Sequence, residues 1–566
     1  MLPNLLNGYI WYHVNGLGAV PWFTPAFCGG IPYFANPSNF YYSVPQFLTF
    51  LTDPLTSVQV TVTFFAAVGF FGFYLLARQC FSLSRSTALL GATLFLFNGF
   101  YIHRMIIGHF TYHSFMGLPL LAFLVLRPLQ LDPKGRIWQI VADSVLGAFL
   151  VAYMVFSGVA PMIVPFLLAV IVLCGVAAIG SPFRLSRFLP FVKFGAAVGL
   201  GFGLAASHVY ITWKFMSQFP RDMYLLPGVS DGTRLLVIVL QSLFLFPAHE
   251  LAAASLVNSQ WLLERHEFEF GVTIIPALLI LAGLWIHRHH WLTVAWWRGF
   301  SPRQWVMLGG LVCLLIIPLA GNYYMPGWNA FLKHIPVIRN SSRLTGWFCV
   351  YIPVVIIAGC LALESLVRWQ RYRWQITGLA IAFVVVVNAL TDRTFYLQEG
   401  YDPTEVVTAY RQVKSGAWTP QITHIAMYTD NKNNPQFPIF RNNAFLKNHS
   451  QLLCYEAVFG YRLERFPFGT LRPGPVVSAT GNSLNLKNPA CFVYPEENQC
   501  TPGDHFRITQ LAAATEFVNY RPFPFVMSVG QRWANYVTCL SLLLLLGVLA
   551  GYLLYRFQQV TRSLQQ

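Results

Sequence analysis

Two apolar runs joined by a basic turn fill residues 114–156, SFMGLPLLAFLVLRPLQLDPKGRIWQIVADSVLGAFLVAYMVF. The turn carries Arg127, Lys134 and Arg136, and the run after it contains a single acidic residue, Asp143. A membrane-crossing helix needs roughly 20 predominantly apolar residues, and Lys and Arg accumulate in short loops on the cytoplasmic side. The stretch therefore predicts two transmembrane helices joined by a cytoplasmic turn.

The same alternation extends over most of the chain. We expect about eleven membrane spans, at 56–77, 86–100, 114–127, 137–156, 160–179, 190–210, 271–287, 304–321, 345–366, 375–391 and 534–555. Every second connection between them is basic, with Arg78/Arg85, Arg127/Lys134/Arg136, Arg184/Arg187, Arg288/Arg298/Arg303, Arg368/Arg371/Arg373 and Arg556/Arg562 on one side. Residues 1–54 contain no Lys or Arg, so the positive-inside rule places them outside and the C-terminus inside.

Composition supports the same class. The chain has 566 residues, of which 55% are hydrophobic and 10% are charged, as in a polytopic membrane protein. The net charge of +16 comes largely from loop residues that set orientation. We therefore expect a multi-pass integral membrane protein with no nucleic-acid partner.

The polar segments divide the chain into four parts. The fold class expected is an all-α polytopic membrane protein carrying a small external domain that is mixed α/β or mostly β, with strands near 422–428 and 491–494. The parts are an external first loop (1–54), a helical membrane domain with an external loop at 211–270 (55–392), the external soluble domain (393–530), and a final span with a short cytoplasmic tail (531–566).

Cysteine usage fits this organisation. Six of the ten cysteines lie in or beside spans, where they serve as small apolar side chains. Cys491 and Cys500 lie nine residues apart in an external polar loop, which favours a disulfide over two free thiols in an oxidising compartment. Cys28 and Cys454 are the other external cysteines. No CxxC or Cys/His zinc spacing is present, so no structural metal is predicted.

Three external stretches carry candidate binding residues. The first, residues 21–37, is dense in Pro, Gly and aromatic residues, among them Trp22. Such a loop could present aromatic faces to sugar rings or lipid headgroups, or could form an aromatic belt at the membrane interface with no ligand.

The second stretch is the turn that holds His109 and His113. These histidines are four residues apart and can share one helix face, a spacing compatible with metal ligation. No third ligand accompanies them in that stretch. The alternatives are a structural hydrogen-bonding role or contact with a phosphate or sugar.

The third stretch precedes the span at 345–366 and is basic although it is external and short. It contains Lys333, His334, Arg339 and Arg343. Because these charges oppose the positive-inside rule, a bound phosphate is a natural explanation, since Arg offers a two-pronged donor. The alternatives are anchoring at lipid headgroups or a salt bridge to Glu267 or Glu269.

The order of four motifs over roughly residues 10–390 resembles that of the YfhO-like bacterial membrane proteins, which are similar to the wider GT-C glycosyltransferases. The motifs are Pro21-Trp22…Cys28-Gly29-Gly30-Ile31-Pro32, Asn98-Gly99-Phe100…Gly108-His109, Glu269-Phe270-Gly271 and Pro336…Arg339…Arg343. The resemblance implies a GT-C-like fold in the bacterial inner membrane. It also implies a transferase that takes sugar from a polyprenyl-phosphate-linked donor and passes it to a glycan or lipid acceptor on the external face, with membrane lipids as further partners.

GT-C enzymes carry a catalytic Asp or Glu in the first external loop, whereas the first acidic residue here is Asp53. Among the external carboxylates we expect Glu269 to be the general base, with Asp53 second. A divalent cation is left open as a cofactor. Two other functions are considered: a transporter or flippase of a lipid-linked glycan, and a non-catalytic cell-envelope assembly protein.

Overall fold

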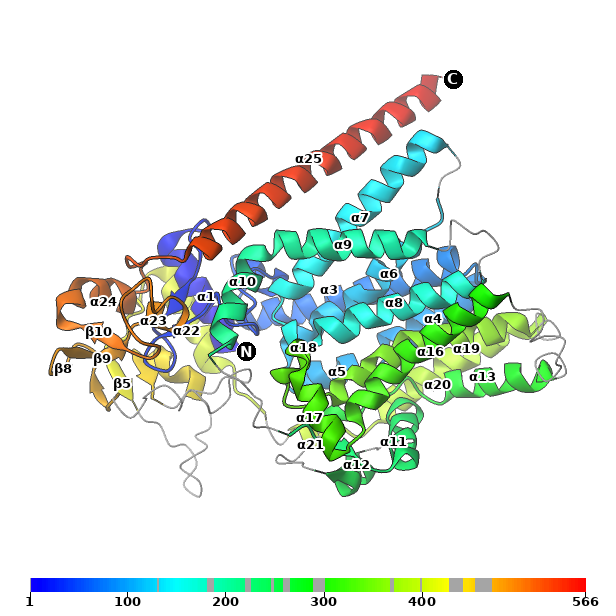
Figure 1. Ribbon diagram of the computed structural model, residues 1–566, viewed down its shortest axis with the longest axis horizontal. Coiled ribbons are helices and arrows are strands. Elements are labelled where there is room, and N and C mark those ends of the chain that lie inside the picture. Colours follow the sequence, from blue (N-terminus) through cyan, green and yellow to red (C-terminus); the bar gives the residue numbers. More distant parts are fainter. Residues whose placement is uncertain are drawn as a thin grey trace.

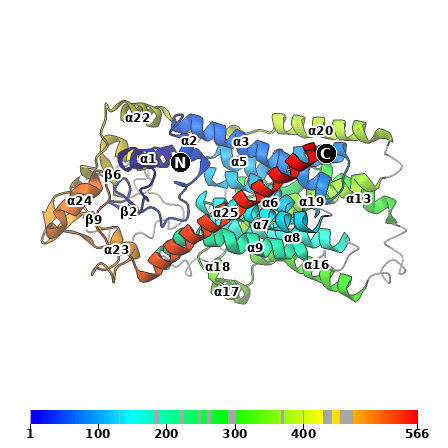
Figure 2. The same cartoon turned by 90° about the horizontal axis from the view of Figure 1, so that it is seen from above.

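The computed structural model shows a long bundle of helices with a smaller mixed lobe at one end (Figures 1 and 2). It describes residues 2–129, 132–180, 188–218, 225–245, 249–257, 265–288, 301–366, 371–397, 400–426, 441–452 and 471–565. The N-terminus lies at the junction of bundle and lobe, and the C-terminus lies well away from the lobe.

Seven helical segments of the described chain are long and apolar enough to cross a membrane, so the protein is a helical membrane protein. They are α3–η1 (Pro54–Leu75 and Leu76–Cys80), α4–α5 (Arg85–Leu96 and Gly99–Ile106), α7 (Pro133–Phe156), α16 (Pro302–Asn322), η5–α19 (Thr345–Val350 and Tyr351–Ser365), α20 (Arg373–Leu390) and Val529–Gln559 of α25 (Val529–Gln565).

The predicted count of about eleven spans is not reached by these helices. The predicted span at 190–210 is a bent pair, α9 (Leu189–Leu204) and α10 (Ala206–Met216), with 74° between them, and would be the eighth. Three others coincide with apolar helices of 10–17 residues: η2–α6 (Phe110–Gly117 and Leu118–Leu126), Ile163–Ile179 of α8 (Ile163–Gly180) and α13 (Ile275–Ile286). Whether these shorter helices cross the bilayer stays a prediction.

The bend between α9 and α10 has a packing cause. Ile211 and Phe215 of α10 are fully buried in the core of the lobe, whereas α9 packs on α7 and α25 in the bundle. The helix turns because its two halves bury their apolar faces against different bodies.

Polar caps set the ends of several bundle helices. The side chain of Asp53 accepts hydrogen bonds from the backbone N–H groups of Leu55 and Thr56 at the start of α3, and Asp132 accepts one from Gly135 at the start of α7. Each cap satisfies donors that the first helical turn leaves unpaired.

Some helices face outward along most of their length. Only 6% of the apolar stretch of α25 and 11% of that of α16 are buried inside the structure. Figure 1 shows α25 crossing beside the bundle with little cover. Such surfaces fit contact with lipid tails. The short helix α11 (Gly232–Phe244) likewise exposes Leu236 and Leu240.

The predicted first loop and the predicted soluble domain share a single hydrophobic core. We call this body the mixed lobe; it comprises the described residues of 2–50 and 400–527. From the N-terminal part come α1 (Leu2–Asn15), β1 (Phe23–Thr24), β2 (Ile31–Pro32) and α2 (Val44–Leu48). From the C-terminal part come α22 (Thr404–Ser415), β5 (His424–Ala426), η7 (Arg441–Lys447), β6 (His449–Gln451), β7 (Gly474–Pro475), β8 (Ala479–Thr480), β9 (Ser483–Lys487), α23 (Ala490–Val493), β10 (His505–Arg507), η10 (Ile508–Gln510) and α24 (Leu511–Val518).

The strands of the lobe form small sheets. In one, β9 lies between β10 and β8 in antiparallel order, and in the other β5 lies between a parallel β6 and an antiparallel β7. Strand β1 pairs with β2 in the N-terminal part. The lobe is therefore mixed α/β.

The glycines in the first motif hold the two parts of the lobe together. Gly29 accepts a backbone hydrogen bond from Lys487 and donates one to the hydroxyl of Ser450. Gly30 has φ +108°, and a Cβ there would lie 2.9 Å from Phe517 and 3.0 Å from the Lys487 carbonyl oxygen. Only glycine accommodates both the backbone angle and this close approach.

The predicted strand at 491–494 is wrong, because residues 491–493 lie in the short helix α23 and Tyr494 follows its last turn. The segment combines Cys, Phe, Val and Tyr, which favour strands, but Asn488 accepts a hydrogen bond from the Ala490 N–H and starts a helical turn. All four side chains of α23 are buried, so packing on every side overrides the local preference.

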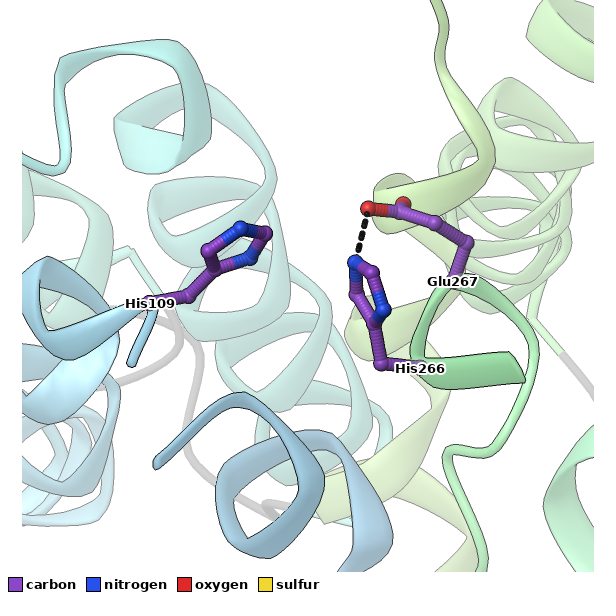
Figure 3. A group of neighbouring side chains, drawn as sticks. All are labelled: His109, His266 and Glu267. Carbon is purple, nitrogen blue, oxygen red and sulfur yellow. Dashed lines mark ion pairs between the residues drawn. The ribbon is translucent and has the colours of Figure 1, made fainter. Parts of the chain in front are cut away.

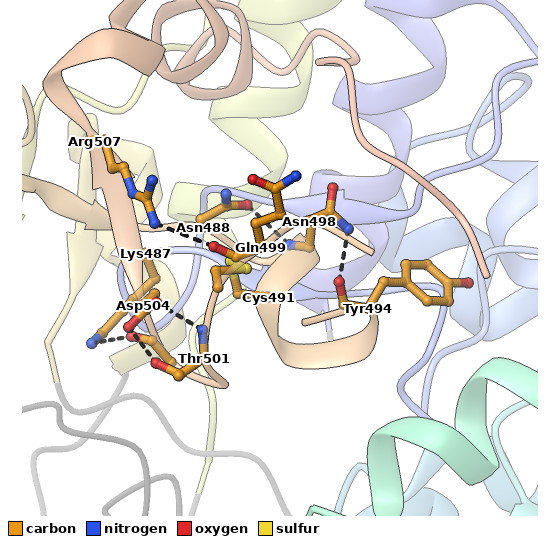
Figure 4. Close-up of a disulfide and its surroundings, with 12 residues drawn as sticks. Lys487, Asn488, Cys491, Tyr494, Asn498, Gln499, Thr501, Asp504 and Arg507 are labelled. Atoms are coloured by element: carbon orange, nitrogen blue, oxygen red, sulfur yellow. Dashed lines mark hydrogen bonds between the residues drawn. A yellow bond between two sulfur atoms is a disulfide. The ribbon is translucent and has the colours of Figure 1, made fainter. Parts of the chain in front are cut away.

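Cys491 and Cys500 form a disulfide that ties α23 to the loop before β10 (Figure 4). Cys28 is also in a disulfide, and Cys454 lies outside the described residues. Bridged cysteines in this lobe fit an oxidising compartment. The six free cysteines among the described residues all belong to the bundle or to α25.

Candidate functional site

A cluster of charged side chains lies where the bundle meets the lobe. We call it the arginine–glutamate cluster; its members are His103, Arg104, His109, Arg265, His266, Glu267, Glu269, Arg343 and Tyr396. They come from α5, the turn after it, the 3-10 turn η4 (Arg265–Glu267) with the residues that follow, the segment before η5, and α21 (Thr394–Leu397). Helix α21 lies between α20 and the C-terminal part of the lobe, which places the cluster at the lobe end of the bundle.

Gly99 brings two of the sequence motifs into contact. Its N–H donates to the carbonyl oxygens of Phe270 (3.1 Å) and Gly271 (2.9 Å), and a Cβ there would lie 2.6 Å from the Glu269 carbonyl oxygen. Asn98 accepts from the Tyr101 N–H and begins α5. Because Gly99, the residue after this cap, has no side chain, the backbone around Glu269 can lie directly against the start of α5.

Glu267 binds three cationic or polar groups while being only 3% exposed. One carboxylate oxygen, Oε1, lies 2.8 Å from Nη2 of Arg343 and 3.0 Å from Nε2 of His266, and Oε2 lies 3.5 Å from Nη2 of Arg104. Burial alone would raise the pKa of Glu267, but Arg343, His266 and Arg104 outweigh it and hold the pKa well below its usual range. The carboxylate is therefore ionised at neutral pH.

Arg104 is the most deeply buried arginine of the cluster, with a side chain that is 1% exposed. Its Nη1 donates to the carbonyl oxygen of His266 (2.9 Å), and its guanidinium carbon lies 3.9 Å from the ring centroid of Phe100. A buried guanidinium needs such partners because its desolvation is costly. Glu267 supplies the countercharge.

Glu269 forms the second half of the cluster and is 1% exposed. Its Oε1 lies 2.5 Å from Nε of Arg265, and its Oε2 accepts a hydrogen bond from the hydroxyl of Tyr396 at 3.2 Å. Nδ1 of His103 lies 3.5 Å from the same oxygen. The carboxylate thus connects the turn at η4, helix α5 and the segment that leads to the lobe.

The charges of the cluster favour an anion. Three guanidinium groups, those of Arg104, Arg265 and Arg343, face two carboxylates and leave one net positive charge. Arg343 is 39% exposed and Arg265 is 18% exposed, whereas both carboxylates are buried. The accessible face of the cluster is therefore cationic, and Arg side chains bind phosphate oxygens well.

The structure brings two further potential metal ligands, His266 and Glu267, close to His109. One ring nitrogen of His109, one of His266 and one oxygen of Glu267 all lie within 4.8 Å of one another. Figure 3 shows the ring of His109 facing His266 and Glu267 from the opposite side of the site. Burial, together with the neighbouring His266, lowers the pKa of His109 to about 3, so its ring is neutral at pH 7.

Arg343 and His109 are thus the predicted binding residues that the structure brings together at Glu267, two residues before Glu269. The salt bridge between Arg343 and Glu267, which the sequence left as an alternative to phosphate binding, is present. It does not exclude an anion, because a guanidinium has five N–H donors and this one is partly exposed.

The other predicted binding residues lie apart from these contacts. His113 is buried between the Phe110 carbonyl oxygen (2.7 Å) and the Tyr153 hydroxyl (2.6 Å). Lys333, in α17 (Pro326–His334), donates to the carbonyl oxygens of Arg339 and Ser341, and His334 bonds the Ala330 carbonyl oxygen. Arg339, at the end of α18 (Pro336–Arg339), is exposed.

Two further predicted site residues contribute to structure. Trp22 packs edge-to-face on Phe34 and Phe525 in the mixed lobe, with centroid distances of 5.0 and 6.0 Å. Both oxygens of the Asp53 carboxylate accept hydrogen bonds at the start of α3, one of them from the Thr56 hydroxyl at 2.7 Å. These contacts account for both residues without a ligand.

An apolar cavity of about 420 Å³ lies outside the cluster. It is formed between α11, the end of α16 and the start of α17, with Leu235, Leu319 and Trp328 in its lining. Leu344, the residue after Arg343, accepts a hydrogen bond from Asn322 at the end of α16. This hydrogen bond joins the neighbour of Tyr323, which lines the cavity, to the neighbour of Arg343.

Five cluster members were not singled out from the sequence: His103, Arg104, Arg265, His266 and Tyr396. A usable signal existed for Arg104, which is a charged residue at the end of an apolar run. Tyr396 carried no such signal, because its role depends on where α21 lies.

Comparison with known proteins adds no relative. No protein-family model matches the chain, and no curated protein or solved structure matches it either.

Proposed function

We propose that the protein is a membrane glycosyltransferase that moves a sugar from a polyprenyl-phosphate-linked donor to a glycan or lipid acceptor on the external face of the bacterial inner membrane. The observation that carries the proposal is the arginine–glutamate cluster, a net cationic site with two buried carboxylates at the lobe end of the membrane helices.

The cluster supplies the two functions that sugar transfer from a phosphate requires. The acceptor hydroxyl oxygen forms a bond to the anomeric carbon while the bond from that carbon to the phosphate oxygen breaks. The hydroxyl proton passes to a carboxylate, for which Glu269 is our candidate, and the phosphate leaves with the bonding electrons. Arg343 and Arg265 stabilise the negative charge that develops on the phosphate.

The apolar cavity supports a lipid-linked donor in particular. A polyprenyl phosphate has an anionic head and a long hydrocarbon tail, so its site needs cations next to an apolar surface. The lining of the cavity is almost wholly apolar, and Asn322, at the end of α16, hydrogen-bonds to Leu344, the residue after Arg343.

The proposal is tested by an in vitro transfer assay with a polyprenyl-phosphate sugar and membrane extract as the acceptor source. We expect Glu269→Gln to lower the rate by about 10²–10⁴-fold, the usual contribution of a positioned base. We expect Asp53→Asn to stay close to wild type, because Asn caps a helix about as well as Asp. If the purified wild-type protein transfers no sugar, or if Glu269→Gln retains full activity, this assignment fails.

Filling the cavity tests the lipid-binding part separately. Ala320 lines it from α16, and Ala320→Trp is expected to weaken donor binding at least tenfold by excluding the hydrocarbon tail. Val312→Trp is the matched control, because Val312 lies on the same helix and is exposed toward lipid. Equal donor affinity in the two variants, measured by competition with a labelled donor, would place the tail elsewhere.

Transport of a lipid-linked glycan is the second candidate, and one observation favours it. Asp143 of α7 and Lys193 of α9 form an ion pair of 2.8 Å in the bundle, with both side chains at most 2% exposed. Ionisable residues buried among membrane helices often mark transport pathways. Reconstituted vesicles that move labelled donor across the bilayer without transferring its sugar would support this candidate instead.

A further inference from the structure

His109, His266 and Glu267 form a set of side chains with the composition of a metal site. Two imidazoles and one carboxylate, each offering one ligand atom, converge to within 4.8 Å. Ligand atoms on a tetrahedral zinc ion with bonds of about 2.1 Å are roughly 3.4 Å apart, so a closure of at most about 1.4 Å would complete the geometry. The residues come from two segments more than 150 positions apart, which only the fold brings together.

His109 provides a second, independent observation. Its Nδ1 is buried and has no hydrogen-bond partner among the residues that the structure describes. Its ring stands edge-on to that of His266, with 4.9 Å between the centroids. A buried polar atom without a partner is costly in a native structure, and a missing ion is one explanation for it.

We propose that His109, His266 and Glu267 bind a first-row divalent metal ion, for which Zn²⁺ is the best match. Two histidines and one glutamate, with a fourth position left to water or an anion, form a known type of catalytic zinc site. The same ligand set is too poor in oxygen for Ca²⁺ or Mg²⁺, which prefer carboxylates and carbonyls.

The two arginines that contact Glu267 determine which of its carboxylate oxygens is available to the metal ion. Arg343 contacts Oε1, the oxygen that lies 3.0 Å from His266, and therefore competes with the metal for it. Being 39% exposed, Arg343 can move into water, whereas buried Arg104 keeps its contact with the other oxygen, Oε2. One carboxylate can thus serve the metal and Arg104 together. The inference is independent of the proposed sugar transfer.

The test is metal binding by the full-length protein in lipid nanodiscs after treatment with a chelator. We expect wild type to bind one equivalent of Zn²⁺ in competition with a chromogenic chelator. His109→Gln should weaken binding at least tenfold, and Arg343→Gln should strengthen it because the competitor is removed. His334→Gln is the control, since His334 is exposed and its Nδ1 hydrogen-bonds to the nearby Ala330 carbonyl oxygen.

Three outcomes would overturn the proposal: no stoichiometric binding by wild type, equal affinity in His109→Gln, or weaker binding in Arg343→Gln. Thermal unfolding of the metal-free variants shows whether each one is folded. If His109→Gln does not fold, visible absorption of the Co²⁺-loaded wild type decides the case, because a four-coordinate site with nitrogen ligands gives an intense band and an octahedral surface-bound ion does not.

Discussion

Glu267→Gln is expected to destabilise the protein by about 3–5 kcal/mol, the usual cost of removing one partner from a buried ion pair. The variant leaves the guanidinium of Arg104 without its carboxylate partner. Arg104 is 1% exposed and packs on the ring of Phe100, so water cannot replace that partner. It also removes the charge that Arg343 and His266 contact. Thermal or denaturant unfolding in lipid nanodiscs measures the loss.

Glu364→Gln is the matched control for this variant. Glu364 pairs with Arg373 at 2.9 Å near the other end of α19, but it is 28% exposed. A pair in contact with solvent contributes no more than about 1 kcal/mol. Similar losses in the two variants would show that the buried carboxylate has no special role.

The same carboxylate predicts a pH dependence. Its pKa is lowered in the folded protein, so in the range between the folded value and the ordinary value of about 4.3 the unfolded chain binds the proton and the folded protein does not. The stabilisation is therefore complete above about pH 4.3 and declines as the pH falls toward the folded pKa. Glu267→Gln should lose this part of the acid sensitivity, and an unchanged profile would contradict the assignment.

Arg343→Lys is expected to lower donor affinity or transfer rate by roughly a hundredfold with little change in stability. A lysine keeps the charge but lacks the planar two-pronged donor that matches a phosphate, and loss of one such donor to a developing negative charge costs about 10²–10³ in rate. Because Arg343 is 39% exposed, its contribution to folding is small. Donor binding and unfolding are measured on the same preparation.

Arg339→Lys provides the comparison. Arg339 ends α18 and is exposed, and it lies four residues before Arg343 in the same basic stretch. If both arginines only anchored the helix at lipid headgroups, both replacements by lysine would be tolerated. Wild-type donor affinity in Arg343→Lys would leave the phosphate site without support.

The membrane class and the helices could be predicted from the sequence. Apolar runs such as 304–321 and 345–366 are continuous, and a bilayer demands that each crossing segment satisfies its own backbone hydrogen bonds. Periodicity and length therefore carry the information locally. The bend at 190–210 could not be predicted, because it depends on α10 burying Phe215 in the core of the mixed lobe.

For the mixed lobe, too, some features could be predicted from the sequence and others could not. The sequence indicated a polar domain near 393–530 with disulfide-forming cysteines, since turn residues and cysteine spacing are local signals. It could not show that residues 2–50 complete the core of that domain, because 349 residues (51–399) separate the two parts. Nor could it show that 491–493 is helical, since tertiary packing reversed the local preference.

For the candidate site, the sequence by itself determined the kinds of residue and their positions at the ends of membrane helices. Arg343 and Glu269 could be recognised because charge beside an apolar run is costly and therefore informative. Only the tertiary structure decided their partners. The pairing of Glu267 with Arg104, Arg343 and His266 joins three segments that are distant in sequence, and the interaction of buried charges depends on distances of a few ångströms that no local pattern encodes.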